Sequence, residues 1–509
     1  MKLQYLISIA AYMLLVISVC SLYARRANKN SDNYFLGGRS LGPWVSAMSA
    51  EASDMSGWLL MGLPGLAYWS GLASAGWTAI GLALGTYFNW LIVSRRLRVY
   101  SEKVEAVTLP EFFANRFHDK SNVILTIASL LIILFFTPYA GSALMACGKL
   151  FSQLFGISYT TMVILAAVFV LLYTFLGGFL AESVSDFMQA ILMIIALVTT
   201  LSVGIIQAGG ISAVIENARE IPGFLSLIKS AVPTDEIVNG QVVFAASEDY
   251  GVITILSGLA WGLGYFGMPQ VLLRFMAIRS EKELSLSRRV ATVWVVISLA
   301  ATIFIGIVGR VLFPSAYMEY GSGNTENIFI LMSTSLLPAV LAGLVCAGIL
   351  AASISSADSY MLISASAVAK NVYKGLIKKD ASDKQIMTIT RIILVVITIV
   401  AVIVATKGGG VIFTIVDFSW AGLGGTFGPL MIFSLFWKRT TRPAAIAGML
   451  TGGLTALIWS FFLTKLGGIF AIYELLPAFV LSSLVIVVVS LCTQPDAAME
   501  KEFEAVQNA

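Results

Sequence analysis

Apolar stretches of about 20 residues, the length a helix needs to cross the hydrocarbon core of a bilayer, recur along almost the whole chain. Only 12% of its 509 residues are charged, whereas a soluble domain carries about twice that proportion. The chain is therefore expected to be an all-α polytopic membrane protein, with lipid around most of its length.

The apolar stretches divide into thirteen predicted transmembrane spans, at about residues 4–24, 41–67, 72–94, 122–150, 158–180, 185–208, 250–273, 287–313, 326–368, 390–406, 411–437, 443–463 and 469–492. Only Lys2 precedes the first span, whereas Arg25 and Arg26 follow it. A secretory signal peptide carries its positive charge in front. The first span is therefore expected to be retained, with the N-terminus outside.

The basic residues gather on every second connection between these spans. The connections predicted to lie inside, with the tail, hold 25 of the 32 Lys and Arg residues: 25–40, 95–121, 274–289, 370–391, 438–442 and 496–509. Cytoplasmic loops of membrane proteins carry an excess of Lys and Arg. This pattern predicts a multi-pass protein of the cell (plasma) membrane that ends in a short cytoplasmic tail, 496–509.

Two spans are interrupted by glycine and proline at corresponding places. The second contains "SDMSGWLLMGLPG" and the seventh contains "WGLGYFGMP". Each opens a set of five helices. Because the two sets are offset by five spans, an odd number, they have opposite orientations in the membrane. Interrupted helices at matching places in two halves point to a transporter's binding site. The alternative is that these glycines allow close helix packing.

Four segments, "LGGRSLGP", "ASDMSGWLLMGLPG", "WGLGYFGMP" and "ILAASISSADS", follow one another along the chain. Together they resemble the solute:sodium symporter family, and within it the sodium/proline symporters. The likeness covers roughly residues 5–495. It implies one transmembrane domain, 1–495, built as a five-plus-five inverted repeat with additional helices. The first repeat is expected at about 41–208 and the second at about 250–437.

The resemblance implies a sodium site between the broken second span and the ninth span. Its expected ligands are carbonyl oxygens near Ala52, Met55 and Ala352 and the hydroxyls of Ser355 and Ser356. Oxygen ligands suit hard cations. The alternative for the serines is small-residue helix packing.

Asp54 is the acidic residue most strongly expected to act in the sodium site. Its negative charge near the helix break can offset the charge of the cation. Alternatively, the carboxylate caps amides that the broken helix leaves free. Glu51, one turn earlier, departs from the glycine that some related symporters have there, and its role is left open.

The resemblance also implies a substrate site. Backbone N–H groups at a helix break attract a carboxylate, and aromatic side chains can form an apolar wall and attract an amine. The alternative for the aromatic residues is ordinary packing. The expected substrate-binding residues are Ser56, Gly57, Tyr139, Trp261, Tyr265 and Pro269.

Two further residues are expected to take part in gating or coupling. Arg39 lies at the inner start of the second span, where it is either a gate residue or a positive-inside anchor. Asp186 lies near an inner helix end, where it acts in coupling or is simply solvated. The resemblance leaves open a second sodium site formed by Asp186, Ser355, Asp358 and Ser359.

The function implied is that of a sodium-coupled secondary active symporter that imports L-proline by alternating access, and not of an enzyme. Sodium is expected as a co-transported ligand, with no cofactor, no catalytic residue, no nucleic acid and no obligate protein partner. The chain lacks the P-loop pattern GxxxxGK[ST], as expected for transport driven by an ion gradient. Two alternatives stay open: a sodium symporter of another carboxylate, a sugar or a vitamin, and a membrane sensor or channel.

Overall fold

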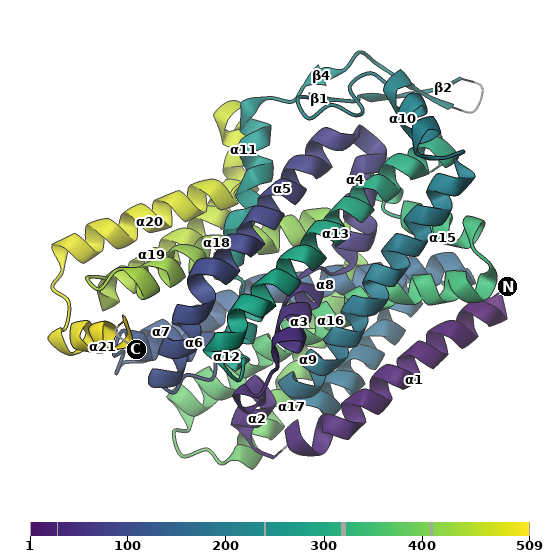
Figure 1. Ribbon diagram of the computed structural model, residues 1–509. Helices are drawn as coiled ribbons and strands as arrows, with labels where there is room; N and C mark the ends of the chain where they lie inside the picture. The colour runs from purple at the N-terminus through teal and green to yellow at the C-terminus, as the bar shows by residue number, and fades with distance from the viewer. Residues whose placement is uncertain (1, 28, 239–240, 317–321, 408–410, 508–509) are drawn as a thin grey trace.

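The computed structural model describes residues 2–27, 29–238, 241–316, 322–407 and 411–507. Long helices form a bundle with short elements at both ends (Figure 1). α2 (Ser31–Leu36), α7 (Leu109–Arg116) and α21 (Ala497–Gln507) lie at one end. We call it the basic end, because the Lys- and Arg-rich connections predicted to lie inside gather there. α10 (Ile211–Glu220) and the strands lie at the opposite end.

The first set of helices begins with an interrupted helix. It consists of α3 (Pro43–Asp54), the π-helical turn η2 (Trp58–Gly62) and α4 (Leu63–Ser70). The remaining elements of the set are α5 (Leu72–Phe88), η3 (Asn89–Val93), α6 (Ser94–Lys103), α7, α8 (Val123–Phe155) and α9 (Tyr159–Gln207). α1 (Lys2–Ala27), α2 and η1 (Gly37–Arg39) precede the set.

The second set also begins with an interrupted helix, made of α11 (Val252–Ala260), the 3-10 segment η4 (Trp261–Gly267) and α12 (Pro269–Ala277). α3 starts at the basic end, whereas α11 starts at the opposite end, so the two interrupted helices run in opposite directions (Figure 1). The set continues with η5 (Glu281–Glu283), α13 (Leu284–Leu312), α14 (Ser322–Thr325), α15 (Ile328–Leu336), α16 (Ala339–Ser366), η7 (Ala367–Ile377), α17 (Asp383–Lys407) and α18 (Ile412–Phe436).

Additional elements follow the second set. The chain closes with α19 (Arg442–Ile458), η8 (Trp459–Leu463), η9 (Thr464–Leu466), η10 (Gly468–Ala471), α20 (Leu475–Cys492) and α21.

The connection between the two sets contains two pairs of short strands. β1 (Lys229–Ser230) pairs antiparallel with β4 (Glu248–Asp249). β2 (Pro233–Val238) pairs in the same way with β3 (Gln241–Phe244).

Among the described residues, ten helices are long and apolar enough to cross a membrane, or eleven if the pair Val252–Gly267 and Pro269–Ala277, bent by 43°, is one span. α9 has 49 residues and is therefore about 74 Å long, over twice the thickness of the hydrocarbon core. Its backbone leaves the helical region at Gly178 (φ 57°, ψ −179°), near the expected boundary between the fifth and sixth spans. The number thirteen stays a prediction.

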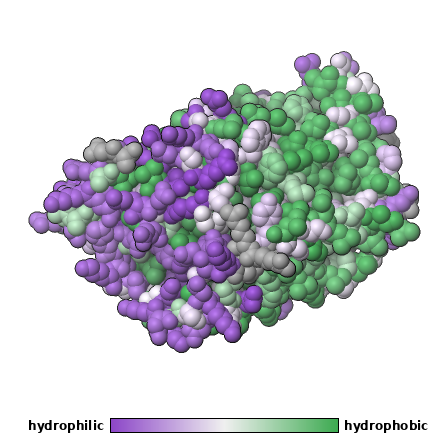
Figure 2. All heavy atoms as spheres, turned by 60° about the horizontal axis from the view of Figure 1, so that its bottom comes forward, coloured by the Kyte–Doolittle hydropathy of each residue, from purple (hydrophilic) through white to green (hydrophobic). Residues whose placement is uncertain are grey.

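The lateral surface of the bundle is apolar. In the view of Figure 2, hydrophobic residues cover one broad side, and hydrophilic residues gather toward the basic end. Large apolar side chains such as Leu130 and Leu134 on α8 and Leu165 on α9 point outward and are exposed. A surface of this kind is stable only against lipid, because in water such a continuous apolar patch would drive association.

Two glycines bring the broken helix of the second set against α5. A Cβ built on Gly85 would lie 2.3 Å from the carbonyl oxygen of Gly262, and one built on Gly262 would lie 2.1 Å from that of Gly81. Close helix packing therefore accounts for these glycines. Close packing and a helix break occur together here, because Gly262 lies in η4, where a 3-10 segment replaces the α-helix.

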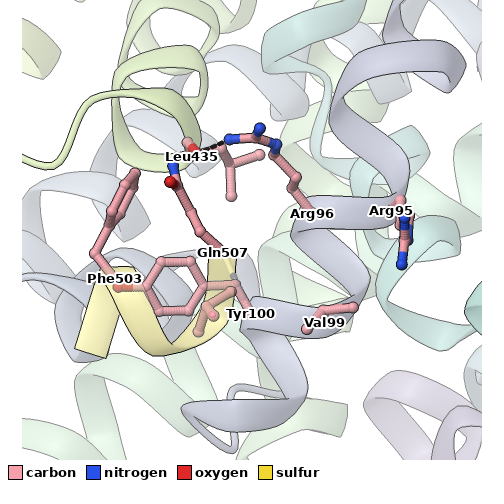
Figure 3. A pocket seen from close by; sticks show the side chains of 8 residues that line it. Arg95, Arg96, Val99, Tyr100, Leu435, Phe503 and Gln507 are labelled. Carbon is pink, nitrogen blue, oxygen red and sulfur yellow. Dashed lines mark hydrogen bonds between the residues drawn. The ribbon is translucent and has the colours of Figure 1, made fainter. Parts of the chain in front are cut away.

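The C-terminal segment is a docked helix rather than a free tail. The Tyr100 hydroxyl donates to Glu502 Oε1 at 3.0 Å, and the Arg116 guanidinium lies 5.0 Å from the centre of the Phe503 ring. Figure 3 shows Phe503 and Gln507 beside α6, around a cavity of about 170 Å³. α21 therefore closes part of the basic end.

Candidate functional site

The break in the first interrupted helix frees the carbonyl group of Ala52. In a continuous α-helix this carbonyl would accept from the N–H of Ser56. Here the Ser56 N–H donates instead to the carbonyl of Asp54 at 3.0 Å, because Met55 leaves the helical region (φ −85°, ψ 73°). A freed backbone group inside a membrane must find a partner in the protein or in a polar cavity.

The partners of this carbonyl are two serines of α16. The hydroxyls of Ser355 and Ser356 both donate to the Ala52 carbonyl, at 2.9 and 3.3 Å. The Ser355 hydroxyl also lies 3.1 Å from the carbonyl of Ala352. Four of the five predicted sodium ligands thus come together from two helices that are about 300 positions apart in sequence. The fifth, Met55, follows Asp54 at the end of α3 and is fully buried.

Asp54 joins the two interrupted helices. Its side chain is 0% exposed. Oδ2 accepts from the Tyr265 hydroxyl at 2.8 Å, and Oδ1 accepts from Gln270 Nε2 at 3.3 Å. Among the described residues, no Lys, Arg or His lies within ion-pair distance of Asp54. The carboxylate therefore accepts two hydrogen bonds from the second interrupted helix. Because no basic side chain in the described part of the chain neutralises it, its charge is available to a cation.

Side chains satisfy the carbonyl groups that the second break exposes. Asn89 Nδ2 donates to the Tyr265 carbonyl at 2.9 Å, and Trp420 Nε1 donates to the Trp261 carbonyl at 2.8 Å. Pro269 begins α12 and has no N–H to leave unpaired. The break in η4 is therefore a stable part of the fold, with its polar groups bound by neighbouring elements.

Two of the predicted substrate residues present unpartnered polar atoms in the buried interior. The hydroxyls of Ser56 and Tyr139 have no hydrogen-bond partner among the described residues, and both side chains are fully buried. The Tyr139 ring stacks on Tyr360, with 4.1 Å between the ring centres. Buried hydroxyls without a partner are costly, so this pair is suited to receive polar groups of a ligand.

Trp261 lies in an aromatic cluster toward the end opposite the basic one. Its ring is 5.4 Å from that of Tyr473, 5.1 Å from Phe413 and 6.0 Å from Trp58. A cavity of about 320 Å³ adjoins the cluster, lined by residues of α4, α5, α11, α18 and the segment before α20. Trp261, Phe413 and Tyr473 line this cavity, whereas Asp54 and Tyr265 do not.

Gly57 packs against α8. A Cβ at this position would lie 2.2 Å from Cβ of Ala146 and 3.2 Å from the Ser353 hydroxyl. The close approach of the two helices explains why no larger residue fits there.

Arg39 ties together three segments of the basic end. Its guanidinium donates to the carbonyls of Met276 at 2.6 Å, Ser101 at 2.9 Å and Ala106 at 2.7 Å. Next to it, the Leu41 N–H donates to the carbonyl of Ala277 at 3.2 Å. These contacts are more than those of a surface anchor, because they join the entry of α3 to the ends of α6 and α12.

Asp186 belongs to a buried charged cluster centred on Arg274. Arg274 Nη2 lies 2.5 Å from Glu182 Oε1 and 3.1 Å from Asp186 Oδ2, and it donates to the Ser359 hydroxyl at 3.0 Å. All four side chains are buried. The alternative that Asp186 is simply solvated is wrong, because its side chain is buried and accepts from Ser49 of α3 and Arg274 of α12. Asp358, next to Ser359 on α16, is also buried.

The model of the sodium:solute symporter family matches residues 34–452.

The chain belongs to the sodium:solute symporter family.

Curated relatives of this symporter cover nearly its whole length. The sodium/proline symporter of Escherichia coli (strain K12) is 40% identical over 484 residues, which are 94% of this chain and 92% of the relative. The sodium/proline symporter of Staphylococcus aureus (strain NCTC 8325 / PS 47) is 38% identical over 513 residues, 99% of this chain and 96% of the relative. Because the family consists of transporters that use sodium, the expectations of a multi-pass transporter, not an enzyme, are confirmed.

Solved structures confirm the expected fold of the symporter. A sodium-coupled sialic acid symporter in a substrate-bound outward-open state matches with a TM-score of 0.77 and 20% identity, over 97% of this chain and 98% of that one. Mhp1, a nucleobase-cation-symport-1 family transporter in a closed conformation, matches with a TM-score of 0.53 and 13% identity, over 94% and 100% of the two chains. The chain therefore has the fold of these two cation-coupled transporters.

Three residues of this region were not among those expected from the sequence. Gln270 donates to Asp54, Tyr360 stacks on Tyr139 with its hydroxyl 3.5 Å from the Asp54 carbonyl, and Arg274 binds Glu182 and Asp186. Gln270 and Arg274 are the two polar residues of the otherwise apolar α12, "PQVLLRFMA". A polar residue inside a predicted span is itself a functional signal, and it could have singled out these two. Tyr360 follows the serines in "SSADSY", but no local signal separates it from a packing tyrosine.

Proposed function

We propose that this symporter uses the sodium gradient to import L-proline by alternating access. The support for proline is the name shared by the relatives from two distant bacteria, which cover the chain almost end to end. A sodium symporter of another small solute is the alternative.

The sodium ion is proposed to lie between the end of α3 and the middle of α16. The observation that carries the proposal is that the hydroxyls of Ser355 and Ser356 both point to the Ala52 carbonyl freed by the break. Carbonyls of Met55 and Ala352 complete a ligand set of oxygen atoms, which suits a hard cation. Asp54 supplies the compensating negative charge.

The substrate is proposed to bind beside the sodium ion. Its carboxylate is received at the break by Ser56 and Gly57, and its ring lies against Tyr139, Trp261, Tyr265 and Pro269. The unpartnered hydroxyls of Ser56 and Tyr139 support this placement.

Transport requires that the two ends open in turn. The Arg39 contacts hold the basic end shut, and the Trp261 cluster closes the path from the opposite end. We infer that sodium and substrate enter past Trp261, and that their binding permits the Arg39 contacts to open. One elementary charge that crosses 100 mV contributes about 2.3 kcal/mol. This supports roughly 50-fold accumulation of substrate for one sodium ion.

We further infer the placement of the protein in the cell. The basic end lies on the cytoplasmic side of the plasma membrane, because basic residues gather in cytoplasmic loops. The N-terminus is then outside and α21 is cytoplasmic. The two repeats lie at about 41–208 and 250–437 of one domain, 1–495.

Asp186 is assigned to coupling. A second sodium ion at Asp186, Ser355, Asp358 and Ser359 stays a weaker proposal, because Arg274 already donates to Asp186 Oδ2 and to the Ser359 hydroxyl.

The deciding experiment is uptake of radiolabelled L-proline by purified protein in sealed liposomes, with and without an inward sodium gradient. Sodium-stimulated accumulation that collapses with the gradient is expected. Absence of sodium-stimulated proline uptake would refute proline as the substrate, and sodium-stimulated uptake of another labelled solute by the same liposomes would assign that solute. Sodium flux without substrate would assign a channel instead.

A further inference from the structure

Glu51 is a buried carboxylate that the proposed function does not use. It lies one turn before Asp54 on α3, toward the basic end, and is 0% exposed. Oε1 accepts from Trp90 Nε1 at 3.2 Å, whereas Oε2 has no hydrogen-bond partner among the described residues. An acidic side chain inside a membrane bundle is expensive and is rarely retained without a function.

The surroundings of Glu51 contain no basic side chain to neutralise it. Its neighbour on α3, Asp54, has the same sign. The guanidinium of α12, Arg274, is bound to Glu182 and Asp186 instead. In the part of the chain that the structure describes, no Lys, Arg or His lies within ion-pair distance of Glu51. A buried carboxyl is either neutral or has a cation beside it, and when Glu51 is ionised the described residues offer no basic side chain as that cation.

Two more oxygen atoms lack a partner, on side chains that bind the two interrupted helices where they meet. Gln270 Oε1 and Asn89 Oδ1 are buried and accept no hydrogen bond among the described residues. Both side chains are bound to the region by their nitrogen atoms, Gln270 to Asp54 and Asn89 to the Tyr265 carbonyl. Their oxygens therefore stay available, and a carboxylate with amide oxygens is a ligand set for a hard cation.

We propose that Glu51, with the side-chain oxygens of Gln270 and Asn89, forms a second binding site for sodium on the basic-end side of Asp54. It is separate from the site at Ser355 and Ser356, because Glu51 is bound through Trp90 to η3 and not to α16. The proposal rests on the proposed sodium coupling and extends it. A cation at this site neutralises the Glu51 carboxylate. It also lies between Asp54 and the basic end, on the path by which sodium would leave.

The test counts sodium ions bound to the purified symporter in detergent by equilibrium binding of radioactive sodium. The wild-type protein is expected to bind one ion more than Glu51→Gln, which keeps the shape and the acceptor for Trp90 but removes the charge. Glu51→Asp is expected to retain the ion with affinity lowered by several-fold. Glu51→Gly serves as a second variant if the first is not monodisperse.

Controls separate this proposal from the function on which it rests. Glu111→Gln removes a glutamate charge near the basic end and outside the site, and is expected to bind as many ions as the wild type. Ser355→Ala is expected to weaken the other site and to keep the Glu51 ion. Equal counts for wild type and Glu51→Gln, or a wild type that binds only one ion, would overturn the proposal. Failure of sodium to stimulate binding of labelled proline to the wild type would instead overturn the proposed function.

Discussion

The Tyr265 hydroxyl donates to Asp54 Oδ2 at 2.8 Å, across 211 positions of sequence. The bond joins the end of α3 to η4, so the two interrupted helices meet at one carboxylate. Any movement of one helix relative to the other must change this contact. The bond therefore links the charge beside the proposed sodium site to the conformation of the proposed substrate site.

Tyr265→Phe should weaken the coupling of sodium to transport. It removes a hydrogen bond to a charged group that contributes about 1.5–3 kcal/mol, so the sodium concentration for half-maximal uptake should rise by roughly 10-fold or more. The measurement is proline uptake as a function of external sodium. Tyr360→Phe is the matched control, because its hydroxyl lies 3.5 Å from the Asp54 carbonyl and contributes less. An unchanged sodium dependence in Tyr265→Phe would refute the role.

Ser355→Ala should raise the sodium requirement by roughly 10-fold, because it removes one oxygen ligand of the cation. Ser353→Ala is a control on the same helix. Its hydroxyl donates to the carbonyl of Ile349 at 2.8 Å and does not reach Ala52. Sodium-dependent proline binding is the readout. Equal effects of the two substitutions would indicate that the serines act in helix packing and not as ligands.

Gly57→Ala should abolish transport through a steric clash with α8. The new Cβ would lie 2.2 Å from that of Ala146, and forced overpacking costs about 1–3 kcal/mol. The double variant Gly57→Ala with Ala146→Gly removes the clash and separates two roles. Recovered uptake would show that Gly57 acts through packing, whereas an inactive but well-folded double variant would support its direct contact with substrate.

Arg274→Met should destabilise the fold, because it leaves Glu182 and Asp186 buried without their cation. Breaking a buried ion pair in this way costs about 3–5 kcal/mol. The midpoint of thermal unfolding in detergent should fall, and adding Glu182→Gln should restore part of it. A midpoint equal to that of the wild type would mean that the carboxylates do not depend on Arg274 for their charge balance.

Opening of the basic end should depend on Arg39. Arg39→Gln removes charge-assisted bonds to the carbonyls of Met276, Ser101 and Ala106. Ser49 is a buried residue of α3 whose hydroxyl donates to Asp186 Oδ2 at 2.8 Å. We expect a cysteine introduced there to react several-fold faster with a thiol reagent applied from the basic end. Arg95→Gln, which removes an exposed arginine paired with Glu281, is the control and should leave the rate unchanged. Equal rates in both variants would show that Arg39 does not hold the path shut.

Patterns along the chain were enough to establish the membrane class, the two interrupted helices and the polar residues at the breaks. Apolar length and the positions of glycine, proline and charge are local properties, and bilayer thickness and backbone hydrogen bonding act on them directly. Asp54 could be singled out for the same reason, since an acid beside a helix break in lipid is costly and is expected where it has a function.

Only the tertiary structure decided which polar groups meet. Ser353 and Ser355 look alike in sequence, yet one bonds within its own helix and the other reaches the Ala52 carbonyl. Asp186 could have been solvated by its position in sequence, but Arg274 binds it from 88 positions away. The physical reason is that the partner of a buried charge depends on which faces of distant helices come together. Packing of the whole bundle sets that arrangement, and no local pattern along the chain records it.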